Sequence, residues 1–163
     1  MHGAWNGHHE HMDDTTASGQ LTAGDLAELR AYLHRLLELV PRLRLGERVG
    51  GGATAGQLAF HAAESSDFWL RRVILGDERP RDREAEFTTT RAREEIERAV
   101  SRAIAACEEA ARRAPRLDRR VEPPPLPDGQ PRGHLPWTVV MALVHVTAHA
   151  AEHVGQLDVA AAR

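Results

Sequence analysis

The sequence contains no lysine and a single cysteine, Cys107. Without lysine, a Schiff-base mechanism that uses a lysine amine is excluded. One cysteine allows no disulfide within the chain, which fits a reducing compartment. Residues 1–20 are polar and lack the apolar segment of a signal peptide. We therefore expect a cytoplasmic protein.

Aromatic residues and long apolar runs are also scarce. Only seven of the 163 residues are Phe, Trp or Tyr, and the arginines form no concentrated basic stripe, so nothing indicates nucleic-acid binding. No apolar run approaches the 18–20 or so residues that a membrane span needs. The formal net charge of −3 and the hydrophobic fraction of 42% are typical of a soluble globular chain of one domain.

Four segments carry apolar residues at three- and four-residue steps, which predicts an all-α protein and specifically a four-helix bundle. Thr54 and Gln57 match a capping box at the start of the second helix, and Gly76 suits its end. The expected helices cover 22–43, about 55–75, about 89–113 and about 137–161.

The stretches between these helices predict the chain's organisation. Residues 77–88 are charged, contain Pro80 and are expected to form a loop. Residues 116–136 hold six prolines and two glycines, so they cannot form regular structure. We expect residues 1–20 to be a flexible histidine-containing tail and residues 21–163 to form a single domain.

Histidine is abundant, with ten in the chain, and three of them fall at four-residue steps in the last helix. Residues four apart share a helix face, so two such imidazoles can bind one metal ion at about 2.0–2.1 Å each. His145 and His153 would lie about 12 Å apart along the axis, because each residue rises about 1.5 Å. The metal pair is therefore His145 with His149, or His149 with His153, and the spacing leaves both open.

A third ligand must come from another helix, and His61 lies on a largely apolar part of the second one. Three histidines leave a coordination position for water or a substrate. If the pair is His149 with His153, His145 is an accessory or packing residue. A fourth ligand from the protein, such as Glu64, Asp67 or His134, would close the site and favour a metal-binding or stress-related bundle without catalysis.

Two other histidine patterns compete with this interpretation. His149, Glu152 and His153 fit the H-x-x-E-H signature of inverted zinc proteases, but the few residues after His153 leave no room for a further ligand and a large cleft. The N-terminal segment could separately chelate metal, although a disordered start is the simpler interpretation. Its histidines are His2, His8, His9 and His11.

At these residues the sequence resembles the DinB-like superfamily, which includes mycothiol-dependent maleylpyruvate isomerases and the bacillithiol and mycothiol S-transferases. The resemblance covers roughly residues 22–161. It is carried by Thr54-Ala-Gly-Gln-Leu-Ala-Phe-His61, with Trp69 later in that helix, and by His145-Val-Thr-Ala-His149-Ala-Ala-Glu-His153-Val-Gly-Gln-Leu157.

The resemblance implies that His61, His149 and His153 hold a divalent metal, zinc or nickel, and that His145 lies one turn before the site. In the mycothiol-using branch the middle ligand is commonly Glu, and this chain has His149 there. Family members are often dimers, so a homodimer is expected.

For a chain with such an open metal site, the resemblance implies the function of a thiol S-transferase or isomerase. It would use mycothiol or a similar low-molecular-weight thiol, with a small electrophile as the other partner and no nucleic acid or membrane involved. Arg71 and Arg72 are candidates to hold a carboxylate, although surface arginines are usually solvated. Cys107 falls on a buried helix stripe and is expected to be packing rather than a nucleophile.

Overall fold

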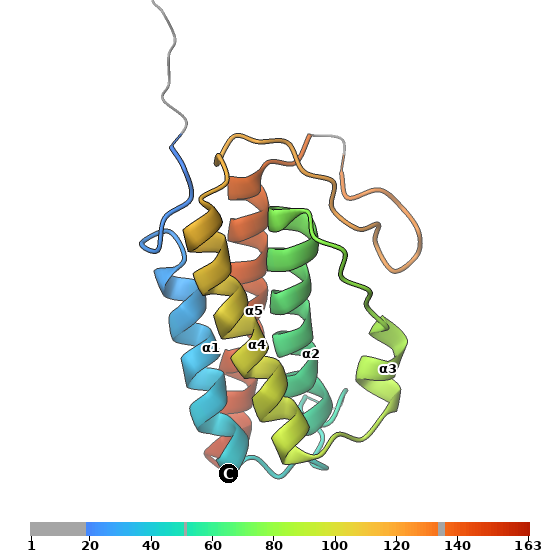
Figure 1. Cartoon of the computed structure of the whole chain (residues 1–163). Helices are drawn as coiled ribbons and strands as arrows, with labels where there is room; N and C mark the ends of the chain where they lie inside the picture. Colours follow the sequence, from blue (N-terminus) through green and yellow to red (C-terminus); the bar gives the residue numbers. More distant parts are fainter. Residues whose placement is uncertain (1–18, 51, 134–135) are drawn as a thin grey trace, which may run out of the picture.

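The computed structural model of the protein describes residues 19–50, 52–133 and 136–163 (Figure 1). Within these residues the chain is helical, with isolated bridges and no strand, so the all-α prediction is confirmed. None of the helices in the described ranges is long and apolar enough to cross a bilayer. The four long helices are α1 (Ala27–Leu39), α2 (Ala55–Phe68), α4 (Arg93–Arg113) and α5 (Val139–Ala161).

The long helices pack as a ring in which α1 and α2 are each flanked by α4 and α5. In Figure 1, α1 and α5 run in one direction while α2 and α4 run in the other. Because α2 and α4 are parallel, the connection between them must return along the full bundle. This return segment, residues 76–92, lies on the outside of α2 and contains the short helix α3 (Arg83–Thr88).

Several expected boundaries differ from those observed. The first predicted helix is shorter, and a 3-10 turn over Val40–Arg42 contains its proline. The prediction that residues 77–88 form a loop is wrong over Arg83–Thr88, which form the helix α3. The Asp82 carboxylate caps the start of this helix by accepting a hydrogen bond from the Ala85 N–H at 2.9 Å. The next helix begins at Arg93 rather than near residue 89, after an extended Thr89.

The start of α2 is fixed as the sequence predicts. The Gln57 N–H donates to the Thr54 hydroxyl at 3.3 Å, and the Thr54 N–H donates to the Gln57 side chain at 2.9 Å. The Gln57 amide also donates to the carbonyl oxygen of Phe87 at 2.5 Å, which ties the end of α3 to the start of α2. One cap therefore orients both the helix and the return segment beside it.

The second helix does not end as a regular α-helix. Its last turns, Trp69–Leu75, form a π-helix, and Gly76 closes it in the left-handed conformation with φ 78°. Such wide turns are rare and are found often at functional sites. Here the π-helix begins at Trp69, a side chain that lines the pocket described below.

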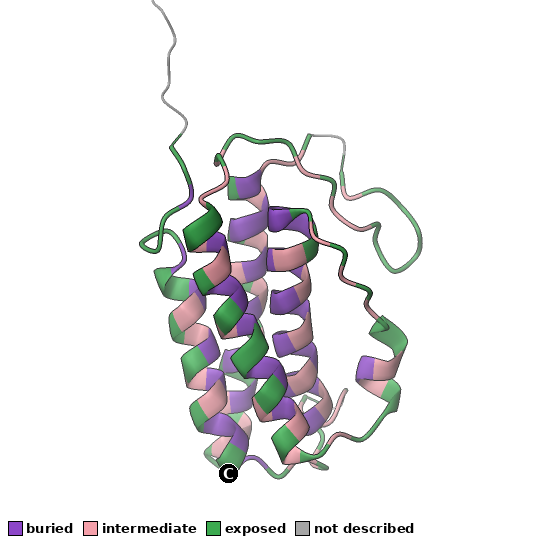
Figure 2. Ribbon diagram, viewed as in Figure 1, coloured by how far each residue is buried: buried purple, intermediate pink, exposed green. Residues whose placement is uncertain are grey.

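The buried residues of the core lie mainly on the four long helices, where they alternate with exposed positions along each ribbon (Figure 2). The buried residues of α1 are leucines, whereas those of α4 are mostly alanines, so the core combines large and small side chains. The buried residues of α4 are Ile96, Ala99, Val100, Ala103, Ala106, Cys107 and Ala110.

Cys107 is fully buried in this core, as the sequence predicts. Burial raises the pKa of its thiol to about 12, so almost no thiolate forms at neutral pH. We expect no reaction with a water-soluble disulfide reagent in the folded protein and one reactive thiol per chain after unfolding in urea. Rapid labelling of the native protein would contradict the packing role.

Candidate metal centre

Three imidazoles from two helices converge at one point of the bundle. His61 comes from α2, and His149 and His153 come one turn apart from α5. The His149 Nε2 atom lies 3.2 Å from the Nε2 atom of His61 and 3.2 Å from that of His153. The potential ligand atoms of the three residues lie within 4.8 Å of one another. Of the two pairs that the spacing left open, the structure brings His149 and His153 to His61.

Two of the three nitrogen pairs have the spacing expected of ligands on a single cation. Two nitrogens bound to one tetrahedral zinc at about 2.0–2.1 Å are about 3.3 Å apart, close to the 3.2 Å separations observed. A hydrogen bond can link only one pair of nitrogens at a time, whereas a cation satisfies all three lone pairs. His61, His149 and His153 therefore form a candidate metal site in which protein residues supply three ligands.

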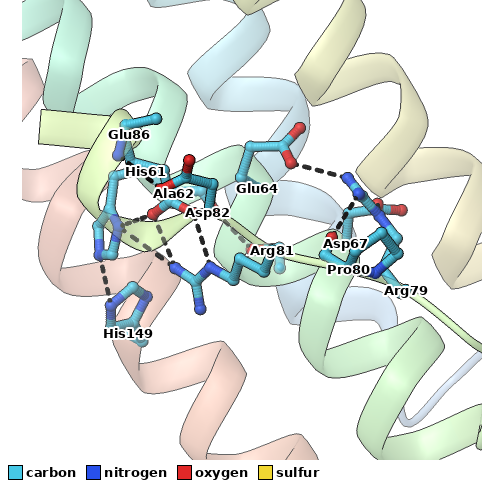
Figure 3. Close-up of polar contacts among 12 residues, drawn as sticks. His61, Ala62, Glu64, Asp67, Arg79, Pro80, Arg81, Asp82, Glu86 and His149 are labelled. Atoms are coloured by element: carbon cyan, nitrogen blue, oxygen red, sulfur yellow. Dashed lines mark hydrogen bonds and ion pairs between the residues drawn. The ribbon is translucent and has the colours of Figure 1, made fainter. Parts of the chain in front are cut away.

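The other ring nitrogen of His61 is held by a carboxylate from the return segment (Figure 3). The Nδ1–H of His61 donates to Glu86 of α3 at 2.7 Å, and Glu86 is 2% exposed. This bond fixes the tautomer that leaves the Nε2 lone pair facing the cluster. Arg81 donates to the two oxygens of the same carboxylate at 2.7 Å and 2.9 Å.

The protonation states match metal binding, which requires neutral imidazole. Burial lowers the pKa of His61 and outweighs the opposing effect of Glu86. Burial, followed by the neighbouring histidines, lowers the pKa of His149 to about 3. Burial would raise the pKa of Glu86, but the bonds from Arg81 and His61 hold it below its ordinary value. At neutral pH, Glu86 is therefore ionised while His61 and His149 are uncharged.

A second ion-pair network clamps the return segment to α2 (Figure 3). Arg79 donates to the buried Asp67 at 2.6 Å and to Glu64 at 2.7 Å. Asp67 also accepts from Arg71 at 3.0 Å. These contacts fix the position of the residues just before Arg81. The network therefore helps to place Arg81 and Glu86 beside the histidines.

The remaining histidine of α5 has a different environment. The His145 ring packs against Trp69 with ring centroids 4.4 Å apart, and edge-on against Trp137 at 5.6 Å. His145 is not part of the three-histidine cluster and forms an aromatic wall one turn away from His149. His153 is oriented by Gln156, whose side-chain oxygen lies 3.1 Å from the His153 Nδ1.

A pocket of about 250 Å³ opens beside the cluster. His61 and His149 form part of its lining, so the candidate metal position borders a space that a small molecule can enter. Trp69 and His145 form an aromatic wall, and Ser65 contributes a hydroxyl. Arginines supply the charged lining; they are Arg81, Arg83 and Arg132.

The other candidates from the sequence lie elsewhere. Glu64 and Asp67 are bound to arginines, and Arg71 is paired with Asp67. Glu152 is exposed on α5. His134 lies outside the described residues. So do the N-terminal histidines, which are His2, His8, His9 and His11.

Sequence reasoning missed Glu86 and the pocket arginines. One local signal was available for Glu86: Asp82 followed by Glu84 and Glu86 resembles a helix start, with acidic residues in the first turn. No periodicity marks Arg83 or Arg132, because both lie outside the long helices. Their proximity to the histidines depends on the path of the return segment and on the path of residues 114–133, which follow α4.

The fold and this cluster define a class: an all-α bundle with a candidate three-histidine metal centre between facing helices. The DinB superfamily model matches residues 25–157, and the chain belongs to this superfamily. The resemblance seen in the sequence is thus confirmed. No curated protein and no solved structure matches the chain.

Removal of the Glu86 carboxylate should weaken metal binding. In Glu86→Ala the His61 Nδ1–H loses its acceptor and the ring loses its fixed orientation, so we expect the Kd for zinc to rise about 10- to 100-fold. Glu86→Gln keeps an acceptor and should have a smaller effect. Competition with a chromogenic chelator measures both, and Glu84→Ala, on the exposed side of α3, is the matched control. Equal affinity in Glu86→Ala and Glu84→Ala would contradict this role.

Proposed function

We propose that this protein binds a divalent cation, zinc or nickel, through His61, His149 and His153, and that it catalyses S-transfer or isomerisation with a low-molecular-weight thiol such as mycothiol. The convergence of three imidazoles beside an open pocket carries this proposal. A divalent cation in that position lowers the pKa of a thiol that reaches it and so favours the nucleophilic thiolate at neutral pH.

The chain's own residues would prepare the site for such a reaction. Glu86 and Gln156 orient the imidazoles of His61 and His153. Trp69 and His145 exclude water from one side of the pocket, which strengthens electrostatic interactions inside it. Cys107 plays no part, since it is buried on α4 and lies outside the residues that line the pocket.

Elemental analysis of protein purified without a histidine tag tests the first half of the proposal, with about one zinc or nickel ion per chain expected. The second half is tested by incubating metal-loaded protein with low-molecular-weight thiols and electrophiles and following thiol consumption. Turnover should disappear in His149→Ala. Stoichiometric metal without turnover for any thiol would favour the alternative, a non-catalytic metal-binding bundle. The homodimer stays a prediction, which sedimentation can test.

A further inference from the structure

The pocket beside the histidine cluster has an excess of positive charge. Arg81, Arg83 and Arg132 line it, and the Arg81 charge is balanced by Glu86. In the parts of the chain that the structure describes, neither Arg83 nor Arg132 takes part in an ion pair. Arg132 and the exposed Arg83 therefore bring two positive charges to a space of about 250 Å³, and neither is paired with a carboxylate among the described residues.

The Arg132 side chain is held in place at this pocket. Its Nε–H donates to the carbonyl oxygen of Pro124 at 2.9 Å, and its guanidinium lies 5.5 Å from the ring centroid of Trp69. Its two terminal nitrogens make no hydrogen bond to any described residue, so they remain free to donate. Burial is the main cause that lowers the Arg132 pKa, and the positive charges of Arg83 and Arg81 lower it further. An anion would relieve that second, electrostatic contribution.

The size of the pocket limits what can enter. Pockets for drug-sized ligands measure about 300–1,000 Å³, so this one of about 250 Å³ suits a small molecule. Guanidinium groups bind carboxylate and phosphate oxygens in paired hydrogen bonds. The lining therefore selects for a small oxyanion.

We propose that Arg83 and Arg132 bind a small oxyanion, a carboxylate or a phosphate, directly beside the three-histidine cluster. The inference deepens the proposed function, because it makes the second substrate a small acid whose charged end is fixed by these arginines. Only the role of the anion as a substrate rests on the proposed function. The anion site itself does not, because protein side chains form it. Arg81, already bound to Glu86, adds to the positive potential without being required as a ligand.

Isothermal titration calorimetry of the full chain tests this, with each variant prepared both metal-loaded and metal-free. The titrants are succinate, inorganic phosphate and the neutral analogue succinamide. We expect one anion site per chain, and Arg132→Gln should weaken binding about 10-fold or more. The double variant of Arg83→Gln with Arg132→Gln should lose measurable binding. Arg98→Gln, on an exposed position of α4 outside the pocket, removes the same charge and should bind as the wild type does.

The outcomes separate this inference from the proposed function. Arginine-dependent binding in both preparations supports the anion site, and the tighter of succinate and phosphate identifies its ligand class. Binding that needs metal but ignores the arginines would overturn the inference, as would equal binding of succinamide or no binding at all. A chain without metal would remove the proposed function, yet arginine-dependent binding in that metal-free chain would still support the anion site.

Discussion

His149→Ala should abolish stoichiometric metal binding, whereas His145→Ala should leave it largely intact. The His149 Nε2 atom is 3.2 Å from the Nε2 atoms of both other cluster members, so its removal takes away the central ligand. The two remaining histidines lie on different helices and cannot hold a cation with comparable affinity. The His145 ring instead packs on Trp69.

The measurement is metal content per chain after treatment with a chelator, reloading and dialysis. Because four histidines lie within the first eleven residues, each variant should also be made with the tail histidines replaced by alanine. Circular dichroism confirms that the bundle has formed in every sample. The tail residues to replace are His2, His8, His9 and His11. If His145→Ala loses the metal and His149→Ala keeps it, the register of the site on α5 is wrong.

The long helices were predictable because their signals are local. Each carries an apolar stripe over several turns, and the cap at Thr54 is visible as a four-residue pattern. The return segment was not, because α3 has only six residues, too few to display a helical period. Its location against α2 comes from pairs far apart in sequence, such as Asp67 with Arg79 and His61 with Glu86.

The candidate site was likewise predictable from the sequence only in part. The spacing of histidines on α5 indicates that a metal pair exists, but it cannot choose between the two overlapping pairs. That choice depends on where α2 places His61 along the bundle and on Trp69, which packs against His145. The sequence also suggested Arg71 as an anion-binding residue, and the structure pairs Arg71 with Asp67. The arginines that line the pocket come instead from the return segment and from the stretch after α4. No local sequence pattern predicts them.

Trp69→Ala should produce the largest loss of stability of any substitution near the site. The side chain is 2% exposed and contacts the rings of His145 and Trp137 at centroid distances of 4.4 Å and 5.5 Å. Truncating a buried tryptophan costs about 3–5 kcal/mol, because apolar contacts are lost and a cavity remains. Urea denaturation measures the free energy of unfolding. Trp69→Phe retains much of the packing and should cost less, and Val159→Ala, 58% exposed on α5, should be nearly neutral.

The same variant tests whether the pocket wall and the metal cluster are independent. Trp69 belongs to no candidate ligand set, so a saturating cation should stabilise Trp69→Ala as much as the wild type. That increment is about 2.7 kcal/mol when the free cation is at 100 times its Kd. A loss below about 1 kcal/mol in the absence of metal would contradict the burial of this side chain. A metal increment that vanished in Trp69→Ala would mean that the aromatic wall holds His149 in its ligating position, since His145 is the residue between them.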